Sequence, residues 1–218
     1  MTSSTSHQPP NILLADDHAV VRRGLKLIVA EVCAEAFVQE VSCGQDVLEA
    51  VRRQVWTLII IDVNFPDKNG LDVLKEVKML RPALPVLILS YHAEAQYAAR
   101  AYKAGAAGYL TKASAPDELG LAIRKVLDGR RYVSPSFAEY LAAHLNGDIT
   151  ALPHETLSDR EYLVLCLLAE GKTVSEIAGQ LVLSVNTIST YRSRLLNKLH
   201  LKTNADLMRY ALDQGLVA

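Results

Sequence analysis

The sequence predicts an α/β domain with a doubly wound, five-stranded parallel sheet, followed by a smaller all-helical domain. Short apolar segments alternate with segments of helical periodicity from Asn11 to Gly129. The apolar segments are almost continuously hydrophobic, as in strands that helices bury on both faces. The alternation stops after about Val133, and only helical patterns follow from Leu157. The chain has 218 residues, half of them hydrophobic, which suits one or two domains with a real core.

Five predicted strands each precede a predicted helix. The strands are expected at residues 11–15, 36–41, 57–62, 86–90 and 107–110. The helices are expected at residues 18–30, 45–53, 71–80, 94–104 and 117–129. The third strand, TLIIID, gives the strongest signal because it is apolar and rich in β-branched residues. Pro116 suits the start of the last of these helices and Gly129 its end. Five such units predict a parallel sheet with helices on both faces.

The second half begins with a predicted tethering helix at 134–147 and a polar, proline-containing linker at 148–156. Three later helix starts match the capping-box pattern, in which a hydroxyl residue precedes an acid by three positions. The pairs are Ser158 with Glu161, Thr173 with Glu176, and Thr203 with Asp206. Glu161 and Glu176 therefore need no catalytic explanation.

We expect a disordered N-terminus at 1–10, an α/β domain at 11–130, a tether and linker at 131–156, and a helical domain at 157–218. The polar N-terminus lacks the pattern of a secretory signal, and the longest apolar runs are too short to span a bilayer. Three scattered cysteines favour reduced thiols in a cytoplasmic protein without a membrane partner. The net charge of −1 excludes no class of partner.

Polar residues stand at the carboxyl ends of the predicted strands, where open α/β sheets bind ligands. They are Asp16, Asp17, Asp62, Ser90 and Lys112. Three carboxylates at one site repel one another, and one would normally take a proton. One Mg²⁺ together with Lys112 would bring the charge of the site to zero. Asp62 lies centrally, so it is the predicted nucleophile for attack on phosphorus, with an acyl phosphate as product.

The segments LLADDHAVVRRGL, IIIDVNFPDKNGLDVLK, VLILSYH and GAAGYLTKAS resemble the receiver domain of two-component response regulators over about residues 11–130. The resemblance implies a flavodoxin-like sheet of strand order 2-1-3-4-5 and phosphorylation by a sensor histidine kinase. The site residues that it implies are the phosphoacceptor Asp62, the Mg²⁺ ligands Asp16, Asp17, Asp62 and the Asn64 backbone carbonyl, the phosphoryl-contacting Lys112, and the switch residues Ser90 and Tyr109.

A short helix at 174–181, a tight turn at 182–184 and a longer helix at 185–200 follow one another in the C-terminal part. The apolar stripe of the longer helix, expected to pack inward, consists of Ile188, Tyr191, Leu195 and Leu199. Its opposite face carries small hydrogen-bonding side chains and cations, which suit phosphates and base edges. No Asp or Glu occurs from 177 to 205, whereas ordinary solvated faces mix both signs. These features favour a DNA-binding helix-turn-helix.

The segment LSDREYLVLCLLAEGKTVSEIAGQLVLSVNTISTYRSRLLNKL resembles the LuxR-type helix-turn-helix, which has four helices. With the receiver, the whole chain resembles the NarL/FixJ class of response regulators. The residues expected at DNA are Thr187, Ser189, Thr190, Arg192, Ser193, Arg194 and Lys198. The class implies a homodimer on double-stranded DNA, with the last helix, 204–215, as a dimerisation element, although by sequence alone this helix could equally be a packing helix.

The predicted function is therefore phosphorylation-dependent transcription regulation, without a metabolic enzyme activity. An alternative is a receiver that controls a protein-interaction module. A dinucleotide-binding enzyme would need G-x-G-x-x-G after the first strand, and a haloacid dehalogenase-type phosphatase would need an acid where Asn64 stands. We expect phosphorylation to draw Ser90 toward the phosphoryl group, with Tyr109 following. In the resting form, the receiver or the tether is expected to hide the helix at 185–200.

Overall fold

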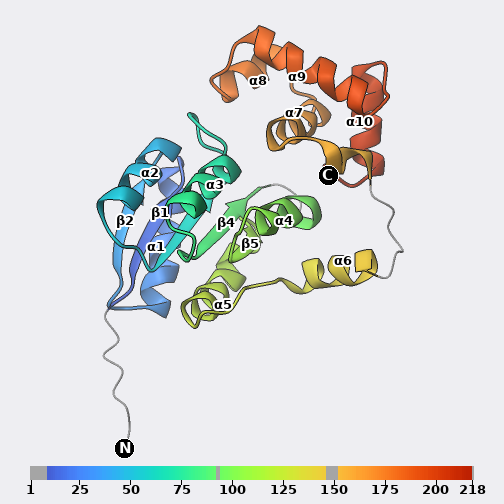
Figure 1. The fold of residues 1–218 in the computed structure, drawn as a ribbon. Helices are drawn as coiled ribbons and strands as arrows, with labels where there is room; N and C mark the ends of the chain where they lie inside the picture. The colour runs from blue at the N-terminus through green and yellow to red at the C-terminus, as the bar shows by residue number, and fades with distance from the viewer. Residues whose placement is uncertain (1–8, 92–93, 146–151, 218) are drawn as a thin grey trace, which may run out of the picture.

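The computed structural model describes residues 9–91, 94–145 and 152–217. Residues 1–8 of the predicted disordered N-terminus lie outside the described residues, as do residues 146–151, which include the predicted end of the tether and the start of the linker. An α/β domain and a helical domain follow one another along the chain (Figure 1). None of the helices in the described ranges is long and apolar enough to cross a membrane.

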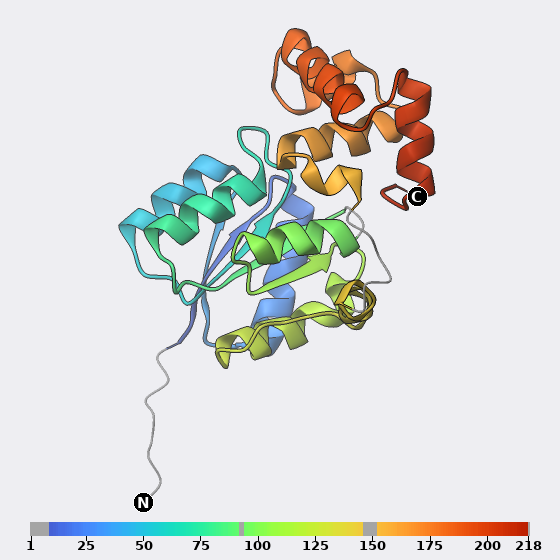
Figure 2. The same ribbon diagram turned by 45° about the vertical axis from the view of Figure 1, so that its right-hand side comes forward.

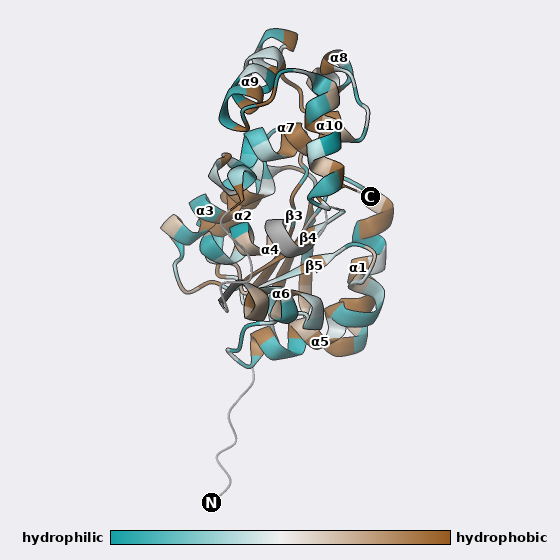
Figure 3. Cartoon of the chain, turned by 90° about the vertical axis from the view of Figure 1, so that its right-hand side faces the viewer, coloured by the Kyte–Doolittle hydropathy of each residue, from teal (hydrophilic) through white to brown (hydrophobic). Residues whose placement is uncertain are grey.

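Five parallel strands form one sheet in the order β2-β1-β3-β4-β5, which confirms the predicted fold class. The strands are β1 (Asn11–Ala15), β2 (Phe37–Val41), β3 (Leu58–Asp62), β4 (Val86–Ser90) and β5 (Gly108–Thr111). The central strands β3 and β4 are buried along their whole length. Figure 3 shows these hydrophobic strands enclosed by helices. This burial explains why the sequence shows continuous apolar runs rather than alternation.

Two hydrophobic clusters cover the two faces of the sheet. Along β3, Leu58 and Ile60 belong to one cluster, and Ile59 and Ile61 to the other, because successive side chains point to opposite faces. The first cluster also takes in buried residues of α1 (Ala19–Val32) and α5 (Ala115–Leu127). The second takes in α2 (Gly44–Arg53), α3 (Gly70–Leu80) and α4 (Glu94–Lys103), and it continues into the helical domain.

The tether forms helix α6 (Pro135–Leu145), which packs on α4. Phe137 stacks on Tyr102 of α4 with ring centroids 5.1 Å apart, and Tyr140 stacks on Phe137 at 5.8 Å. The Tyr102 hydroxyl donates to the Tyr132 carbonyl just before the tether. The predicted tethering helix is thus attached to the α/β domain by an aromatic stack.

The helical domain contains a short 3-10 turn, η1 (Pro153–Thr156), and the helices α7 (Asp159–Ala169), α8 (Val174–Gln180), α9 (Val185–Lys198) and α10 (Asn204–Asp213). All three predicted capping boxes are formed, at the starts of α7, α8 and α10. The predicted helix 185–200 ends earlier, at Lys198, because His200 has a positive φ of 55°. These four helices confirm the predicted four-helix domain.

The prediction of a plain polar linker up to residue 156 is wrong in its last part. Residues 153–156 form the turn η1, and His154 is fully buried. Its ring Nδ1 lies 2.7 Å from the Tyr210 hydroxyl of α10, and its ring lies 6.3 Å from that of Tyr162. The polar, proline-containing sequence suggested a solvated segment, but these tertiary contacts bury the imidazole.

Candidate functional site: an acidic phosphoryl site and a helix-turn-helix

The polar residues at the strand ends meet at one edge of the sheet, as predicted. Asp62 ends β3 and pairs in register with Leu89, next to Ser90 at the end of β4. Asp16 is fully buried, as is Ser90, and Asp62 is 1% exposed. The Lys112 ammonium lies 2.7 Å from Oδ2 of Asp16 and 2.7 Å from Oδ2 of Asp62. The parallel register thus brings an acid, a hydroxyl and a cation together from distant parts of the chain.

Four potential metal-ligating side chains lie together at this edge. Ligand atoms of Asp16, Asp17, His18 and Asp62 all lie within 4.8 Å of one another. Sequence reasoning missed His18, whose Nδ1 lies 2.6 Å from Oδ1 of Asp17 and 3.4 Å from Oδ1 of Asp16. The sequence signal that could have identified His18 as a potential ligand is its position directly after Asp16 and Asp17. The cluster is acceptor-rich and open on the side of Asp17, whose side chain is 34% exposed.

The electrostatics of the site leave Asp62 poorly compensated. Burial, partly offset by Lys112 and reinforced by Asp16, raises the pKa of Asp62 to about 6. Burial also works against the charge of Lys112, but Asp62 and Asp16 raise the pKa of its ammonium. Among the described residues, Oδ1 of Asp62 is buried without a hydrogen-bond partner. A hard cation with oxygen ligands would fit this orphaned oxygen beside two further carboxylates.

The loop after β3 folds back over the end of that strand. Asn69 caps α3 by accepting from the Leu71 amide at 2.8 Å, and Asn64 forms an isolated antiparallel bridge with Asn69. The Gly70 amide donates to the Val63 carbonyl at 2.7 Å. A Cβ on Gly70 would lie only 2.1 Å from the Asp62 carbonyl oxygen. Gly70 therefore permits the close approach that places Asn64 beside Asp62.

The candidate switch residues lie inside the protein. The side chains of Ser90 and Tyr109 are 0% and 1% exposed. Tyr109 belongs to the hydrophobic cluster that continues into the helical domain through Tyr97 and Tyr162. Tyr109 thus belongs to the same buried cluster as residues of the helical domain.

Helix α9 presents its polar face outward. Ile188, Leu195 and Leu199 of the predicted apolar stripe are buried, and Tyr191 is half-buried. Of the seven residues predicted at DNA, four are exposed and three are half-buried. The exposed ones are Thr190, Ser193, Arg194 and Lys198, and the half-buried ones are Thr187, Ser189 and Arg192.

Several of these side chains already have partners within the protein. Ser184 caps α9 and its hydroxyl lies 2.8 Å from that of Thr187. Arg192 Nε donates to Asn204 at 2.5 Å. The Lys198 ammonium lies 2.7 Å from Oε2 of Glu161. Of the three cations predicted at DNA, Arg194 is the exposed one that appears in none of these bonds.

The structure does not show the expected hiding of the helix at 185–200. The polar contacts between the two domains involve η1 and α7 instead, and Figures 1 and 2 show α9 on the side of its domain away from the receiver. The tether α6 lies beside α4, not over α9. The physical reason is that the first turn of α7 offers Asp159 and Tyr162 to Arg100 of α4, whereas the outer face of α9 carries mainly small polar groups and cations.

Comparisons with known proteins agree with both halves of this description. The model of the response regulator receiver domain matches residues 12–124, and that of the luxR family of bacterial regulatory proteins matches residues 155–211. The chain is similar to the response regulator UvrY of Escherichia coli K12, with 33% identity over 94% of this chain and 95% of that protein. It is similar to the response regulator GacA of Pseudomonas aeruginosa, with 32% identity over 94% and 97% of the two chains.

Among solved structures, the chain resembles RcsB of Salmonella enterica serovar Typhimurium bound to the promoter rprA in the presence of the phosphomimetic BeF3−. The TM-score is 0.63 at 26% identity, and the match covers 92% of this chain and 98% of that one. The two family matches show a receiver domain followed by a luxR-type domain, and the relatives share this arrangement over nearly the whole chain. The chain therefore belongs to the NarL/FixJ class of two-component response regulators, and it is a DNA-binding transcription regulator that depends on phosphorylation.

Proposed function

We propose that Asp62 is the residue that accepts the phosphoryl group and that a sensor histidine kinase donates it. A carboxylate oxygen of Asp62 attacks phosphorus, the phosphorus–nitrogen bond of phosphohistidine breaks, and its electron pair returns to the imidazole. The observation that carries this proposal is the position of Asp62, buried at the strand end between Lys112 and the Asp16–Asp17 pair. Lys112 stabilises the charge of the transferred group in this arrangement.

Mg²⁺ is the proposed cofactor, held by Asp16, Asp17, Asp62 and the backbone carbonyl of Asn64. The orphaned oxygen of Asp62 and its raised pKa support this, because burial and the neighbouring Asp16 disfavour the charge of Asp62 and Lys112 offsets them only in part. When bound, the ion would neutralise charge on the transferred phosphoryl group. Asp16 and Asp17 would orient the ion, and the loop that depends on Gly70 would orient the Asn64 carbonyl.

Ser90 and Tyr109 are the proposed switch, in which the Ser90 hydroxyl moves toward the phosphoryl group and Tyr109 follows. The controlled surface is the outer face of α9, which would meet double-stranded DNA. The proposed contacts are Thr187, Ser189, Thr190, Arg192, Ser193, Arg194 and Lys198. We further propose a homodimer on DNA, a cytoplasmic location and no metabolic enzyme activity, with the domain bounds 11–130, 131–156 and 157–218.

Intact-mass measurement tests the phosphoryl site. Wild-type protein treated with acetyl phosphate and Mg²⁺ should gain the mass of one phosphoryl group, and Asp62→Ala should gain none. Asp128→Ala is the matched control, because Asp128 is an exposed carboxylate paired with Arg130 away from the site. An unlabelled wild-type protein, or a labelled Asp62→Ala protein, would refute the proposal.

The salt dependence of binding tests the DNA surface. The affinity of the phosphorylated protein for duplex DNA should fall with ionic strength with a log–log slope of about −0.9 per neutralised phosphate. Arg194→Ala should make this slope shallower by about 1. Arg130→Ala, which removes an exposed cation of the receiver, should leave it unchanged. A slope that does not respond to Arg194→Ala would exclude this residue from the phosphate contacts.

A further inference from the structure

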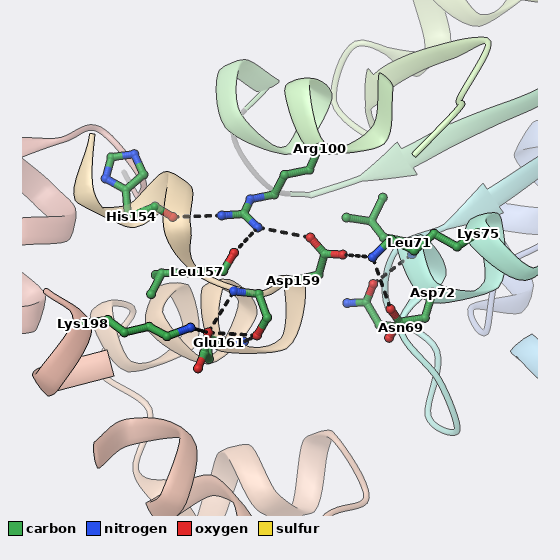
Figure 4. A network of polar contacts seen from close by, with 11 residues as sticks. Asn69, Leu71, Asp72, Lys75, Arg100, His154, Leu157, Asp159, Glu161 and Lys198 are labelled. Carbon is green, nitrogen blue, oxygen red and sulfur yellow. Dashed lines mark hydrogen bonds and ion pairs between the residues drawn. The ribbon is translucent and has the colours of Figure 1, made fainter. Parts of the chain in front are cut away.

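The loop between β3 and α3 carries Asn64, whose backbone carbonyl is a proposed ligand of Mg²⁺. The Asn69 side chain holds the far end of this loop, because it accepts from the Leu71 amide at the start of α3 (Figure 4). The Gly70 amide donates to the Val63 carbonyl at 2.7 Å and returns the chain to the end of β3. Both contacts lie within the loop and its own strand and helix, so by themselves they do not fix the distance from Asn64 to the acids that follow β1.

Asp67 connects this loop to α2. Its Oδ1 accepts from the Gly44 amide at 2.9 Å, and its Oδ2 accepts from the Gln45 amide at 2.8 Å. These are the first two amides of α2, and Cys43, which precedes them, makes no capping hydrogen bond with its side chain. A carboxylate is favourable at this end of a helix, where the amides lack partners within the helix. Asp67 therefore caps α2 from a separate segment of the chain.

The start of α2 lies so close to the loop that it leaves little room for a side chain. A Cβ on Gly44 would lie 2.8 Å from Cγ2 of Val73 in α3 and 3.1 Å from Cβ of Lys68 in the loop. Helices α2 and α3 lie side by side (Figures 1 and 2). The two hydrogen bonds of Asp67 are therefore made to a part of α2 that packing holds in place.

The chain just before α2 also holds the loop of the acidic pair. Strand β2 ends at Val41, and the Val41 carbonyl accepts from the Asp16 amide at 3.3 Å. Residues 41–45 thus contact both the loop that begins with Asp16 and the loop that carries Asn64. The bond from Asp16 and the two bonds to Asp67 together relate the positions of these two loops, which carry the proposed metal ligands.

We infer that Asp67 is a positioning residue of the phosphoryl site. By capping α2, its carboxylate holds the Asn64 carbonyl at the distance from Asp16 and Asp17 that a single Mg²⁺ requires. Mg²⁺ demands a nearly ideal octahedral geometry, so a small displacement of one oxygen ligand lowers its affinity. Both oxygens of Asp67 accept from α2 amides, so Asp67 acts through the loop and not as a ligand. The inference rests on the proposed function, because it takes these residues as the ligands of the ion.

Mg²⁺ binding to Asp67→Ala tests this inference, with a titration of nitrogen-15-labelled protein followed by amide chemical shifts and without a phosphodonor. The dissociation constant should rise about tenfold relative to wild type, at the lower end of the effect of residues that orient metal ligands. Asp67→Asn should raise it less, because its amide oxygen can still accept one of the two hydrogen bonds. The matched control is Asp46→Asn, which removes an exposed carboxylate from the same first turn of α2 and should leave the dissociation constant unchanged.

A second substitution separates positioning from helix stability. Cys43→Ser supplies a local cap to α2, because Cys43 precedes the helix with an extended backbone and serine is a preferred residue there. In the double variant Asp67→Ala/Cys43→Ser, the unfolding free energy, measured in urea, should return toward that of the wild type. The dissociation constant for Mg²⁺ should stay raised, because a cap on α2 from its own chain segment does not hold the loop.

The rate of phosphorylation by acetyl phosphate gives an independent readout. The Mg²⁺ concentration for half-maximal rate should rise about tenfold in Asp67→Ala, as the dissociation constant does. The rate at saturating Mg²⁺ should approach that of the wild type, because Asp62 and Lys112 are held at the strand ends and make their contact without Asp67.

Three results would overturn the inference. They are an unchanged dissociation constant in Asp67→Ala, its recovery in Asp67→Ala/Cys43→Ser, and an equal rise in Asp46→Asn, which would make charge alone the cause. A wild type that takes no label at any Mg²⁺ concentration is a different failure, which removes the proposed phosphoryl site and the inference with it. A labelled wild type with an unaffected Asp67→Ala removes the inference alone.

Discussion

Two buried carboxylates, one in each domain, have opposite electrostatic environments. Asp62 in the receiver is 1% exposed and Glu161 in the DNA-binding domain is 3% exposed. Burial, with Lys112 only partly offsetting it, raises the pKa of Asp62 to about 6. Burial acts on Glu161 in the same direction, but hydrogen bonds from Lys198 and Ser158 outweigh it and lower the pKa of Glu161.

The difference lies in how many partners each carboxylate has. Glu161 accepts from the Ser158 amide at 2.8 Å, from the Ser158 hydroxyl at 3.0 Å and from Lys198 at 2.7 Å. Asp62 shares Lys112 with Asp16 and, among the described residues, has one oxygen without a partner. Glu161 is thus satisfied within the fold, whereas Asp62, the proposed phosphoacceptor, keeps unused capacity for a ligand.

The largest expected effect comes from Asp62→Asn in metal-free protein. The folded pKa of about 6 lies above the ordinary pKa of an aspartate, 3.8, so the folded state binds more protons between these two pH values. The stability contribution of Asp62 is therefore full below pH 3.8 and is lost as the pH rises through 6. By this linkage, the substitution should raise the unfolding free energy by up to about 3 kcal/mol at pH 7.5.

Urea unfolding in EDTA at pH 4 and at pH 7.5 measures this effect. The gain from Asp62→Asn should be present at pH 7.5 and small at pH 4. A gain that does not depend on pH would show that the charge of Asp62 is not its cause.

Glu161→Gln should have the opposite sign. Because the folded pKa of Glu161 is lowered, its contribution is present above the unfolded value and is lost as the pH falls through the folded value. At neutral pH, the substitution should lower the unfolding free energy by about 1–3 kcal/mol, since it weakens a buried, charge-assisted capping box.

Glu176→Gln is the matched control, because Glu176 makes the same capping box on an exposed helix end. Its loss in the same unfolding assay should be smaller than that of Glu161→Gln. Equal losses would mean that burial and Lys198 add nothing to the role of Glu161.

Magnesium should stabilise the receiver through Asp62. At ten times its dissociation constant, Mg²⁺ should raise the unfolding free energy of the wild type by about 1.4 kcal/mol. Asp62→Asn should show a reduced gain, and Glu161→Gln should show the full one. Titration with Mg²⁺ under thermal unfolding measures it, and an equal gain in all three proteins would place the ion elsewhere.

The smallest expected effect is that of Lys198→Ala, which removes the partner of Glu161. Because the Lys198 side chain is 41% exposed, the expected loss of unfolding free energy is only about 1 kcal/mol or less. Lys202→Ala, which removes an exposed cation just beyond α9, serves as the control in the same unfolding assay. A loss in DNA affinity without a loss in stability would show that Lys198 acts at DNA and not on Glu161.

Sequence patterns located most of this architecture because they report local chemistry. A capping box needs a hydroxyl and an acid three residues apart, so all three could be identified from Ser158, Thr173 and Thr203 onward. The strand-end residues Asp62 and Lys112 could be placed together because a parallel sheet collects the carboxyl ends of its strands. His18 was missed because its role depends on the direction of its ring toward Asp17.

By itself, the sequence determined the converging acids and the polar face of α9 through periodicity and spacing, and it implied the strand order through its resemblance to receiver domains. Only the tertiary structure decided the burial of His154, the partners of Arg100 and the outward direction of α9. His154 is buried by contacts within the helical domain, such as that with Tyr210, whereas the Arg100 guanidinium of α4 donates across the domain boundary to the His154 carbonyl. Each of these contacts joins residues more than fifty positions apart. No local sequence pattern reports such contacts, because tertiary packing is decided by many weak interactions between residues that are far apart in the chain.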